Sequence, residues 1–243
     1  MWYVMSHHSR DPRKVLQGLA KQGIDAVLSV DKSDWNKKGT MKDMTKHIGV
    51  CDNYMNILNY HDSDKWKIIL HDDVNIPEGL VENINHILEF APENPVAFFS
   101  FPYQVKQEGK EDSHILDGTY ETFATQCHAI PTSMIDGFIQ WQKDNVTKYG
   151  HLAEDSMLWC WAYYTNTPLY TVLPSLIQHE GWNKTTFHYA AKFQGEYRYA
   201  KNYNPNFDVQ SVDWQYEFAN PIIDRRPIHS FYTQVIRKEL LNG

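Results

Sequence analysis

The sequence predicts an α/β fold with a mostly parallel central sheet and helices on both faces. Two observations carry this prediction. Through the first hundred residues, short apolar segments that suit buried strands alternate with amphipathic segments that suit helices. The later part is less regular, and beyond residue 190 the chain is aromatic, polar and weakly periodic. We therefore expect a sheet with an irregular aromatic-rich C-terminal subdomain beside it.

The first hundred residues contain the clearest element signals. The helix signal is sharpest after residue 10, where Asp11 can cap the N-terminus, Pro12 suits the first helical position and Gly23 suits the end. The expected strands cover residues 2–6, 25–30, 67–70 and 96–101. The expected helices cover residues 11–23, 40–60 and 78–91.

In the second half, strands are expected over residues 121–131 and from 168, where an ordered loop follows to residue 181. Helical patterns are expected over residues 131–144, 153–166 and, closing the chain, 232–241.

Composition excludes several classes of protein. Hydrophobic residues make up 42% and charged residues 22% of the 243, which indicates a globular chain. The net charge of −7 argues against a general polyanion binder. Three cysteines cannot form a complete disulfide set, which favours a reducing compartment. No stretch approaches the roughly 20 apolar residues of a membrane span. We expect a cytoplasmic protein, in the host cytoplasm if viral, with no obligate protein partner.

Two adjacent acids end the third expected strand. Asp72 and Asp73 follow Ile68-Ile69-Leu70 and His71 directly, and such carboxylates repel each other unless a cation or hydrogen-bond donors lie between them. An acid at this place is otherwise a turn or helix-cap residue. A pair at the end of an apolar strand favours a hard divalent cation. In parallel sheets ligands bind beyond the carboxyl ends of the strands, where Ser6-His7-His8 and Asp31 also lie.

The segment "IILHDDVNIPEGL" resembles the aspartate motif of the GT-A glycosyltransferases, α/β enzymes that use nucleotide-sugar donors. The resemblance implies a single GT-A-like domain over residues 1–243, with a nucleotide-sugar-binding half (1–105) and an acceptor-binding half (106–243). It implies that Asp73 binds the metal and Asp72 contacts the donor. His71 departs from the family, which often has a first acid at this position.

Two later segments extend the resemblance in the expected order. "YGHLAEDSMLWCWAYY" resembles the family's acidic segment beneath the acceptor, which implies Asp155, or else Glu154, as the base that deprotonates the acceptor hydroxyl. "LPSLIQHEGWNKTT" resembles the late loop, which implies His179 as a second metal ligand and Lys184 near the diphosphate. Each segment also has a simpler interpretation when it is taken alone. Glu154 and Asp155 would then complement a helix dipole, and His179 would be a structural residue.

Together these segments predict a glycosyltransferase dependent on Mn²⁺ or Mg²⁺ that takes a UDP-linked sugar. Ser6, His7, His8 and Asp31 are expected to hold the base and ribose of the donor. The compact, unanchored chain looks like the viral and phage members of the family. No Gly-rich phosphate loop is present, so nothing supports a kinase or a dehydrogenase.

The acceptor is the least constrained part of the prediction. Residues 182–203 interleave Lys and Arg with aromatic residues, a pattern that suits single-stranded nucleic acid as well as the packing of a subdomain. The pattern favours a hydroxymethylated base in phage DNA as the acceptor. A surface or capsid glycan is the alternative acceptor. A non-catalytic sugar-nucleotide-binding module and a metal-dependent hydrolase remain as rival classes.

Overall fold

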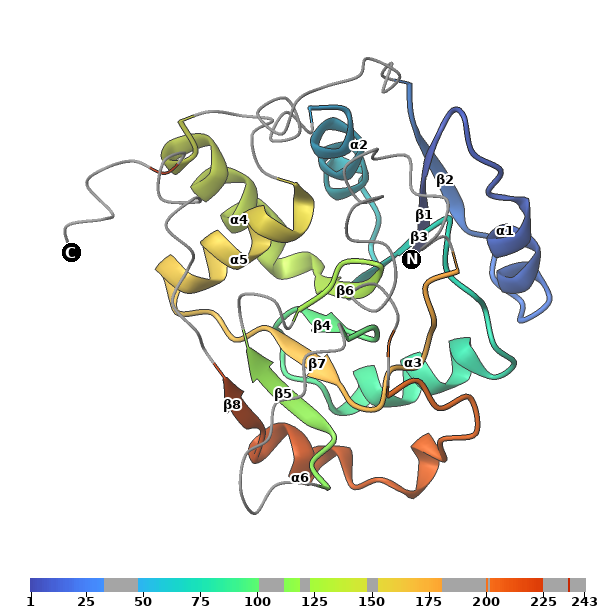
Figure 1. Cartoon of the computed structure of the whole chain (residues 1–243). Helices are drawn as coiled ribbons and strands as arrows, with labels where there is room; N and C mark the ends of the chain where they lie inside the picture. Colours follow the sequence, from blue (N-terminus) through green and yellow to red (C-terminus); the bar gives the residue numbers. More distant parts are fainter. Residues whose placement is uncertain are drawn as a thin grey trace, which may run out of the picture.

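The protein is built on one eight-stranded sheet with helices packed on it (Figure 1). The computed structural model describes residues 1–32, 48–100, 112–118, 123–147, 153–180, 200, 202–224 and 236. The strand order is β2-β1-β3-β6-β4-β7-β5-β8. The strands are β1 (Trp2–His7), β2 (Val27–Asp31), β3 (Trp66–His71), β4 (Val96–Ala97), β5 (Ile115–Gly118), β6 (Cys127–Pro131), β7 (Tyr170–Val172) and β8 (Ile222–Asp224).

The sheet is mixed, so the prediction of a mostly parallel sheet is wrong. Strand β1 pairs in parallel with β2 and β3, as the alternating strand and helix signals of that region require. Strand β6, however, runs antiparallel to both β3 and β4, and β5 runs antiparallel to β7. A short apolar run specifies a buried strand but not its direction, which is decided by the loop that leads into it.

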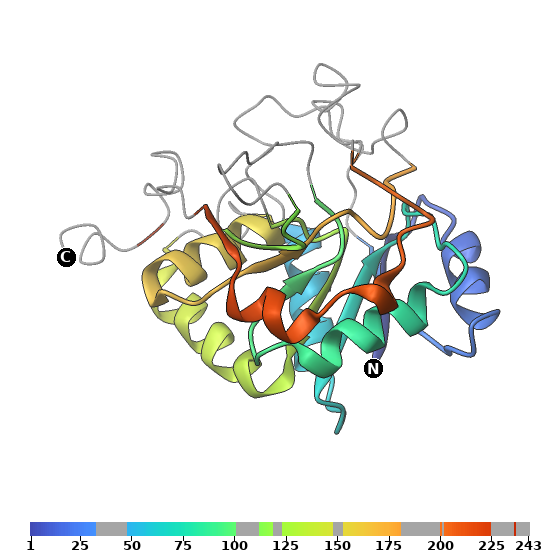
Figure 2. The same ribbon diagram turned by 90° about the horizontal axis from the view of Figure 1, so that it is seen from below.

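Helices cover both faces of the sheet. In Figure 1, α2 and the pair α4 and α5 lie on one side of the strands, and α3 and α6 lie on the other. Figure 2 shows α3 and α6 side by side from below. The helices are α1 (Arg13–Ala20), α2 (Ile48–Asn59), α3 (Leu80–Phe90), α4 (Thr132–Asn145), α5 (Glu154–Thr165) and α6 (Trp214–Ala219).

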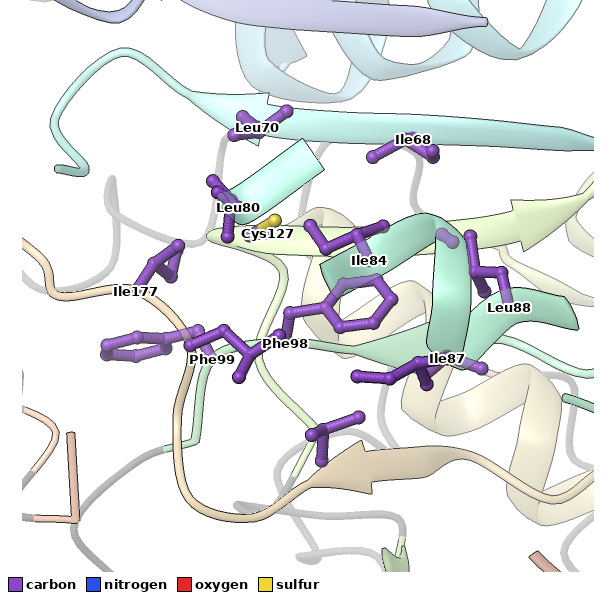
Figure 3. Packing of buried hydrophobic residues seen from close by; sticks show 14 of the residues in the cluster. Ile68, Leu70, Leu80, Ile84, Ile87, Leu88, Phe98, Phe99, Cys127 and Ile177 are labelled. Carbon is purple, nitrogen blue, oxygen red and sulfur yellow. The ribbon is translucent and has the colours of Figure 1, made fainter. Parts of the chain in front are cut away.

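Strand β3 is buried on both faces because its side chains alternate between two hydrophobic cores. Ile68 and Leu70 pack with Leu80 and Ile84 of α3, as Figure 3 shows, whereas Ile69 packs on the opposite face against residues of α2, α4 and α5. All three aliphatic side chains are at most 3% exposed. A strand packed on both faces is a rigid support for the residues that follow it, which here are Asp72 and Asp73.

Several element boundaries differ from the predictions. Helix α1 begins one residue later than Pro12, and the Asp11 carboxylate accepts a hydrogen bond from Arg13 N at 3.1 Å. Gly23 ends this helical segment with a φ of 81°, in the left-handed region that favours glycine. Strand β4 has two residues instead of six. Short elements such as β5, β8 and α6 carry no periodic signal and were not predicted.

Parts of four predicted helices and strands lie outside the described residues: 40–47 of the second helix, 101 of the strand at 96–101, 121–122 of the strand at 121–131, and all of the closing helix at 232–241 except Ile236. The division into a donor half and an acceptor half stays a prediction. The described helices include none that is long and apolar enough to cross a membrane. Cys51, Cys127 and Cys160 are all buried.

Candidate active site

The carboxyl ends of β1, β2 and β3 meet at one edge of the sheet. The register pairs His7 with Asp31 and Met5 with His71, so the residues that leave these strands start side by side. Asn53 of α2 holds the edge together, because its amide donates to Ser6 O at 3.3 Å and to Ser29 O at 3.2 Å. The predicted donor-binding residues at these three strand ends therefore lie on one edge.

Beyond this edge, His7 and His8 turn the chain toward α1. His7 is buried, and its Nδ1 lies 2.7 Å from Ser9 Oγ. His8 is exposed, and the centroid of its ring lies 4.2 Å from that of His7. Arg10 N donates to His7 O at 2.9 Å, which closes the turn and brings the Arg10 side chain to the edge. Two imidazoles and a guanidinium therefore follow β1.

Arg10 bridges the two acids after β3. Its Nη1 lies 3.1 Å from Asp72 Oδ1, and its Nη2 lies 2.7 Å from Asp73 Oδ2. The other oxygen of Asp72 accepts a hydrogen bond from Ser6 Oγ at 2.5 Å. The carboxylates of Asp72 and Asp73 are 3% and 8% exposed, so both charges are removed from water and depend on these partners.

His179 reaches the same acid pair from the loop after β7. Its Nε2 lies 3.1 Å from Asp73 Oδ2, and its side chain is 3% exposed. The backbone fixes this meeting, because Val74 and His179 form an antiparallel bridge and Glu180 N donates to Asp73 O at 2.7 Å. Asn75 N also donates to Gln178 O at 2.9 Å. The contact between Asp73 and His179 is therefore held by main-chain hydrogen bonds on both sides of it.

The environment moves the pKa values of the two acids apart. Burial raises the pKa of Asp73, but the charges of His179 and Arg10 outweigh burial and hold the pKa well below its usual range. Burial likewise raises the pKa of Asp72, and there Arg10 and Ser6 do not fully offset it, so that pKa lies above its ordinary value. Of the two acids, Asp73 is therefore the one whose ionised form its surroundings favour.

A second polar cluster lies on the other side of His71. Glu154 Oε1, at the first position of α5, lies 3.3 Å from His71 Nε2 and accepts a hydrogen bond from Thr125 Oγ1 at 3.2 Å. The two atoms lie within ion-pair distance, and His71 Nε2 makes no hydrogen bond of good geometry in the described part of the chain. Burial lowers the pKa of His71, but its contact with the Glu154 carboxylate outweighs burial and raises the pKa.

Asp155 differs from Glu154 although the two are neighbours in one helical turn. Asp155 is half-buried, and its Oδ1 accepts from Ser156 N at 2.5 Å and from Ser156 Oγ at 3.1 Å. Burial, followed by the charge of Glu154, raises the pKa of Asp155 to about 6. A carboxyl with this pKa is ionised at neutral pH and still basic enough to accept a proton.

The predicted metal ligands can be tested against the described residues. Asp73 Oδ1 and His179 Nδ1 are buried without a hydrogen-bond partner in that part of the chain, so one carboxylate oxygen and one imidazole nitrogen stay available. The described residues contain no group of three or more His, Cys, Asp or Glu side chains placed to hold a metal ion. Mg²⁺ and Mn²⁺ take hard oxygen and imidazole ligands, and Mg²⁺ commonly keeps waters and substrate phosphates. Asp73 and His179 therefore have the chemistry of ligands for such an ion, and the nitrogen of His179 that faces Asp73 is Nε2.

The structure thus brings most of the predicted residues to one edge. The predicted residues that lie at or just after the ends of β1, β2 and β3 are Ser6, His7, His8, Asp31, Asp72 and Asp73. Later segments of the chain add Glu154, Asp155 and His179. Their roles stay predictions. Lys184 and most of the basic stretch 182–203 lie outside the described residues.

Sequence reasoning missed two residues of this region. Arg10 was not singled out in the sequence, and His71 was noted only as a departure from the family motif. A signal for Arg10 exists, because a cation shortly after one strand can reach acids that follow the adjacent parallel strand. No sequence signal indicates that His71 contacts Glu154, since that contact joins separate parts of the chain.

Comparison with known proteins gives distant structural matches. No model of a known protein family matches the chain, and no curated protein sequence matches it. One similar solved structure is a glycosyltransferase involved in the glycosylation of the major capsid of PBCV-1, with a TM-score of 0.30 and 11% identity. That match covers 56% of this chain and 62% of the viral one, so this chain spans less than two thirds of it.

A second similar structure is A197 from STIV, with a TM-score of 0.39 and 12% identity over 73% of this chain and 83% of the other.

Proposed function

We propose that this chain is a metal-dependent glycosyltransferase that moves a sugar from a UDP-linked donor to a hydroxyl group. One observation carries the proposal. Asp73, which follows the buried strand β3, and His179, from a loop much later in the chain, share one buried cluster with Asp72 at the carboxyl edge of the sheet. That edge is where parallel α/β sheets bind their ligands.

The acids at this edge suit the donor. Asp73 stays ionised and, with His179, would hold the ion, while Asp72 lies beside Ser6 at the end of β1 and would contact the donor sugar or ribose. A bound Mn²⁺ or Mg²⁺ would supply charge stabilisation for the diphosphate that leaves. The His7 and His8 rings and the Asp31 carboxylate are the groups proposed to hold the base and ribose.

Transfer also needs a base for the acceptor hydroxyl, and we assign this role to Asp155. Glu154 is engaged by Thr125 and His71, whereas Asp155 is half-buried and has a pKa raised to about 6. A base with such a pKa is matched to neutral pH, and general-base help is worth about 10²- to 10⁴-fold in rate. Asp155 would take the proton as the new glycosidic bond forms and the bond to the leaving phosphate breaks.

For the acceptor, we favour a hydroxymethylated base in phage DNA over a surface or capsid glycan. The support is the interleaving of cationic and aromatic residues through 182–203, which suits phosphates and an exposed base. DNA binding that weakens with salt is expected, with a smaller salt dependence after Lys192, Arg198 and Lys201 are neutralised. Absence of any DNA binding would leave the glycan as the acceptor.

The rival class is a sugar-nucleotide-binding module without catalysis. Both classes predict that a nucleotide sugar with Mn²⁺ raises the melting temperature, since a ligand bound to the native state stabilises it. Only the enzyme also releases UDP slowly from its donor when the acceptor is absent. A panel of nucleotide sugars, screened for stabilisation and then for UDP release, separates the two. Stabilisation without any release of UDP would favour the module. If no nucleotide sugar raises the melting temperature and none releases UDP, the proposal is wrong.

A further inference from the structure

We infer that Arg10 is a diphosphate-binding residue that bridges the acid pair in the free protein and is released when a divalent ion takes its place. This inference rests on the proposed function and goes beyond it, because it assigns a role to a residue outside the motif. The contact that carries it is the fork of Arg10 on both Asp72 and Asp73.

Burial explains why Arg10 occupies the acids in the first place. The two carboxylates are 3% and 8% exposed, and a buried carboxylate without a countercharge is strongly destabilising. A guanidinium can contact two carboxylates at once through its planar fork, which an ammonium group cannot do. Arg10 is therefore the countercharge that makes this arrangement stable before any ligand arrives.

Charge balance explains why Arg10 must leave for the donor to bind. With Asp72 and Asp73 ionised, the two carboxylates outnumber the single guanidinium that bridges them, so these three groups carry a net negative charge, which repels a diphosphate. A divalent ion on Asp73 and His179 reverses the sign. The ion also takes the Asp73 carboxylate as a ligand, so that this carboxylate no longer holds Arg10. The guanidinium can then pair with a phosphate.

The position of Arg10 permits this exchange. Its side chain is 23% exposed, in contrast to the buried acids, and it follows β1 in a turn rather than lying within the strand. Asp73 is fixed by its backbone hydrogen bond from Glu180 and by the bridge next to it. The more exposed partner of the ion pair is thus the arginine, and the acid is the partner held by main-chain hydrogen bonds next to it.

Arg10→Met tests the exchange because it removes the charge but keeps most of the stem. Mn²⁺ binding to the nucleotide-free variant, measured by titration calorimetry, should be at least about tenfold tighter than in the unmodified protein, because the ion no longer displaces a guanidinium. UDP binding at saturating Mn²⁺ should be about tenfold weaker, because one charge-assisted contact to phosphate is lost. The opposite signs of the two effects distinguish the exchange from general damage to the site.

Two further variants complete the experiment. Arg13→Met is the matched control, since Arg13 lies on the same segment, is 78% exposed and pairs with Asp11, and it should change neither affinity. Arg10→Lys keeps a cation beside the acids and so covers the case in which Arg10→Met does not fold. It should bind Mn²⁺ more tightly than the unmodified protein, because an ammonium group does not bridge both carboxylates.

The outcomes separate this inference from the proposed function. If the unmodified protein binds Mn²⁺ and UDP but the Arg10 variants bind Mn²⁺ no more tightly, or Arg10→Met binds UDP equally well, the exchange is wrong and the proposed function stands. If the unmodified protein binds neither Mn²⁺ nor UDP, both fail together.

Discussion

Glu154 Oε1 lies 3.3 Å from His71 Nε2, so the first acid of α5 contacts the residue that immediately precedes the acid pair of β3. The second acid, Asp155, bonds to its neighbour Ser156 instead. The two acids of one helical turn thus belong to different environments. This difference makes the two acids distinguishable by mutation.

Asp155→Asn should leave donor binding intact and reduce transfer by about 10²- to 10⁴-fold, the usual contribution of a general base. Glu154→Gln, in contrast, removes the charge beside His71 and should cost less in turnover if Glu154 only supports the site. UDP affinity and single-turnover transfer, measured on both variants, check this assignment. A normal rate in Asp155→Asn would move the base to Glu154.

The pH dependence of transfer follows from the pKa of Asp155, which is raised to about 6 by burial and the charge of Glu154. Below that value the base is protonated, so the single-turnover rate should fall about tenfold per pH unit on the acid side. Above it the rate should level off. Initial rates from pH 4.5 to 8, with the donor saturating at each point, measure the profile. A rate that is flat down to pH 5 would contradict the assignment.

Asp155 should also destabilise the fold at neutral pH. Folding raises the pKa of this carboxyl from 3.8 to about 6. The contribution of this carboxyl to the free energy of unfolding is therefore fully present at a pH below 3.8, and it is lost as the pH rises through about 6. Asp155→Asn should therefore raise the free energy of unfolding by at most about 3 kcal/mol at pH 8, since the pKa rises by about two units and each unit is worth about 1.4 kcal/mol.

Below pH 4 the same variant should show no gain, because the carboxyl is then protonated in both states. Urea unfolding at pH 8 and pH 3.5 provides the comparison. An equal effect at both pH values would mean that the substitution acts through packing and not through charge.

Asp73→Ala should abolish transfer and Mn²⁺ binding together while the fold survives, because the variant removes the acid that contacts His179 and whose pKa is held well below its usual range. Arg10 would still pair with Asp72, which limits the cost to stability. Asp144→Ala on α4, whose carboxylate bonds to Gln140 in an exposed contact, is the control. Mn²⁺ titration and transfer assays check the outcome. Transfer at the native rate in Asp73→Ala would show that the metal assignment is wrong.

At the opposite end of β3, Lys67 and Asp62 form a buried ion pair at 2.6 Å, each side chain 3% exposed, and Tyr3 donates a hydrogen bond to the same carboxylate. Lys67→Met should cost about 3–5 kcal/mol in unfolding free energy, because Asp62 would lose its buried countercharge. Lys65→Met is the matched control.

Lys65 lies 3.8 Å from Glu93 with both side chains more than half exposed, so its loss should cost at most about 1 kcal/mol. Chemical unfolding of the two variants gives the comparison. Equal costs would mean that burial of the Lys67 pair does not matter for stability.

The sequence by itself determined the local architecture around β3. Ile68, Ile69 and Leu70 suffice to specify a buried strand, and the acids that follow it are placed at the sheet edge by chain continuity alone. The alternation of strand and helix up to α3 was also readable, because periodicity is a property of neighbouring residues. The class of the fold, α/β with helices on both faces, followed from that alternation.

Only the tertiary structure decided how distant segments meet. The direction of β6 depends on the segment that enters it, and the contacts of Arg10 with Asp73 and of His71 with Glu154 join residues that no local pattern relates. The pKa of Asp155 likewise depends on burial, which a sequence does not state. Local propensities act within a few residues, whereas charge pairing and desolvation depend on which surfaces pack together, and packing is a property of the whole chain.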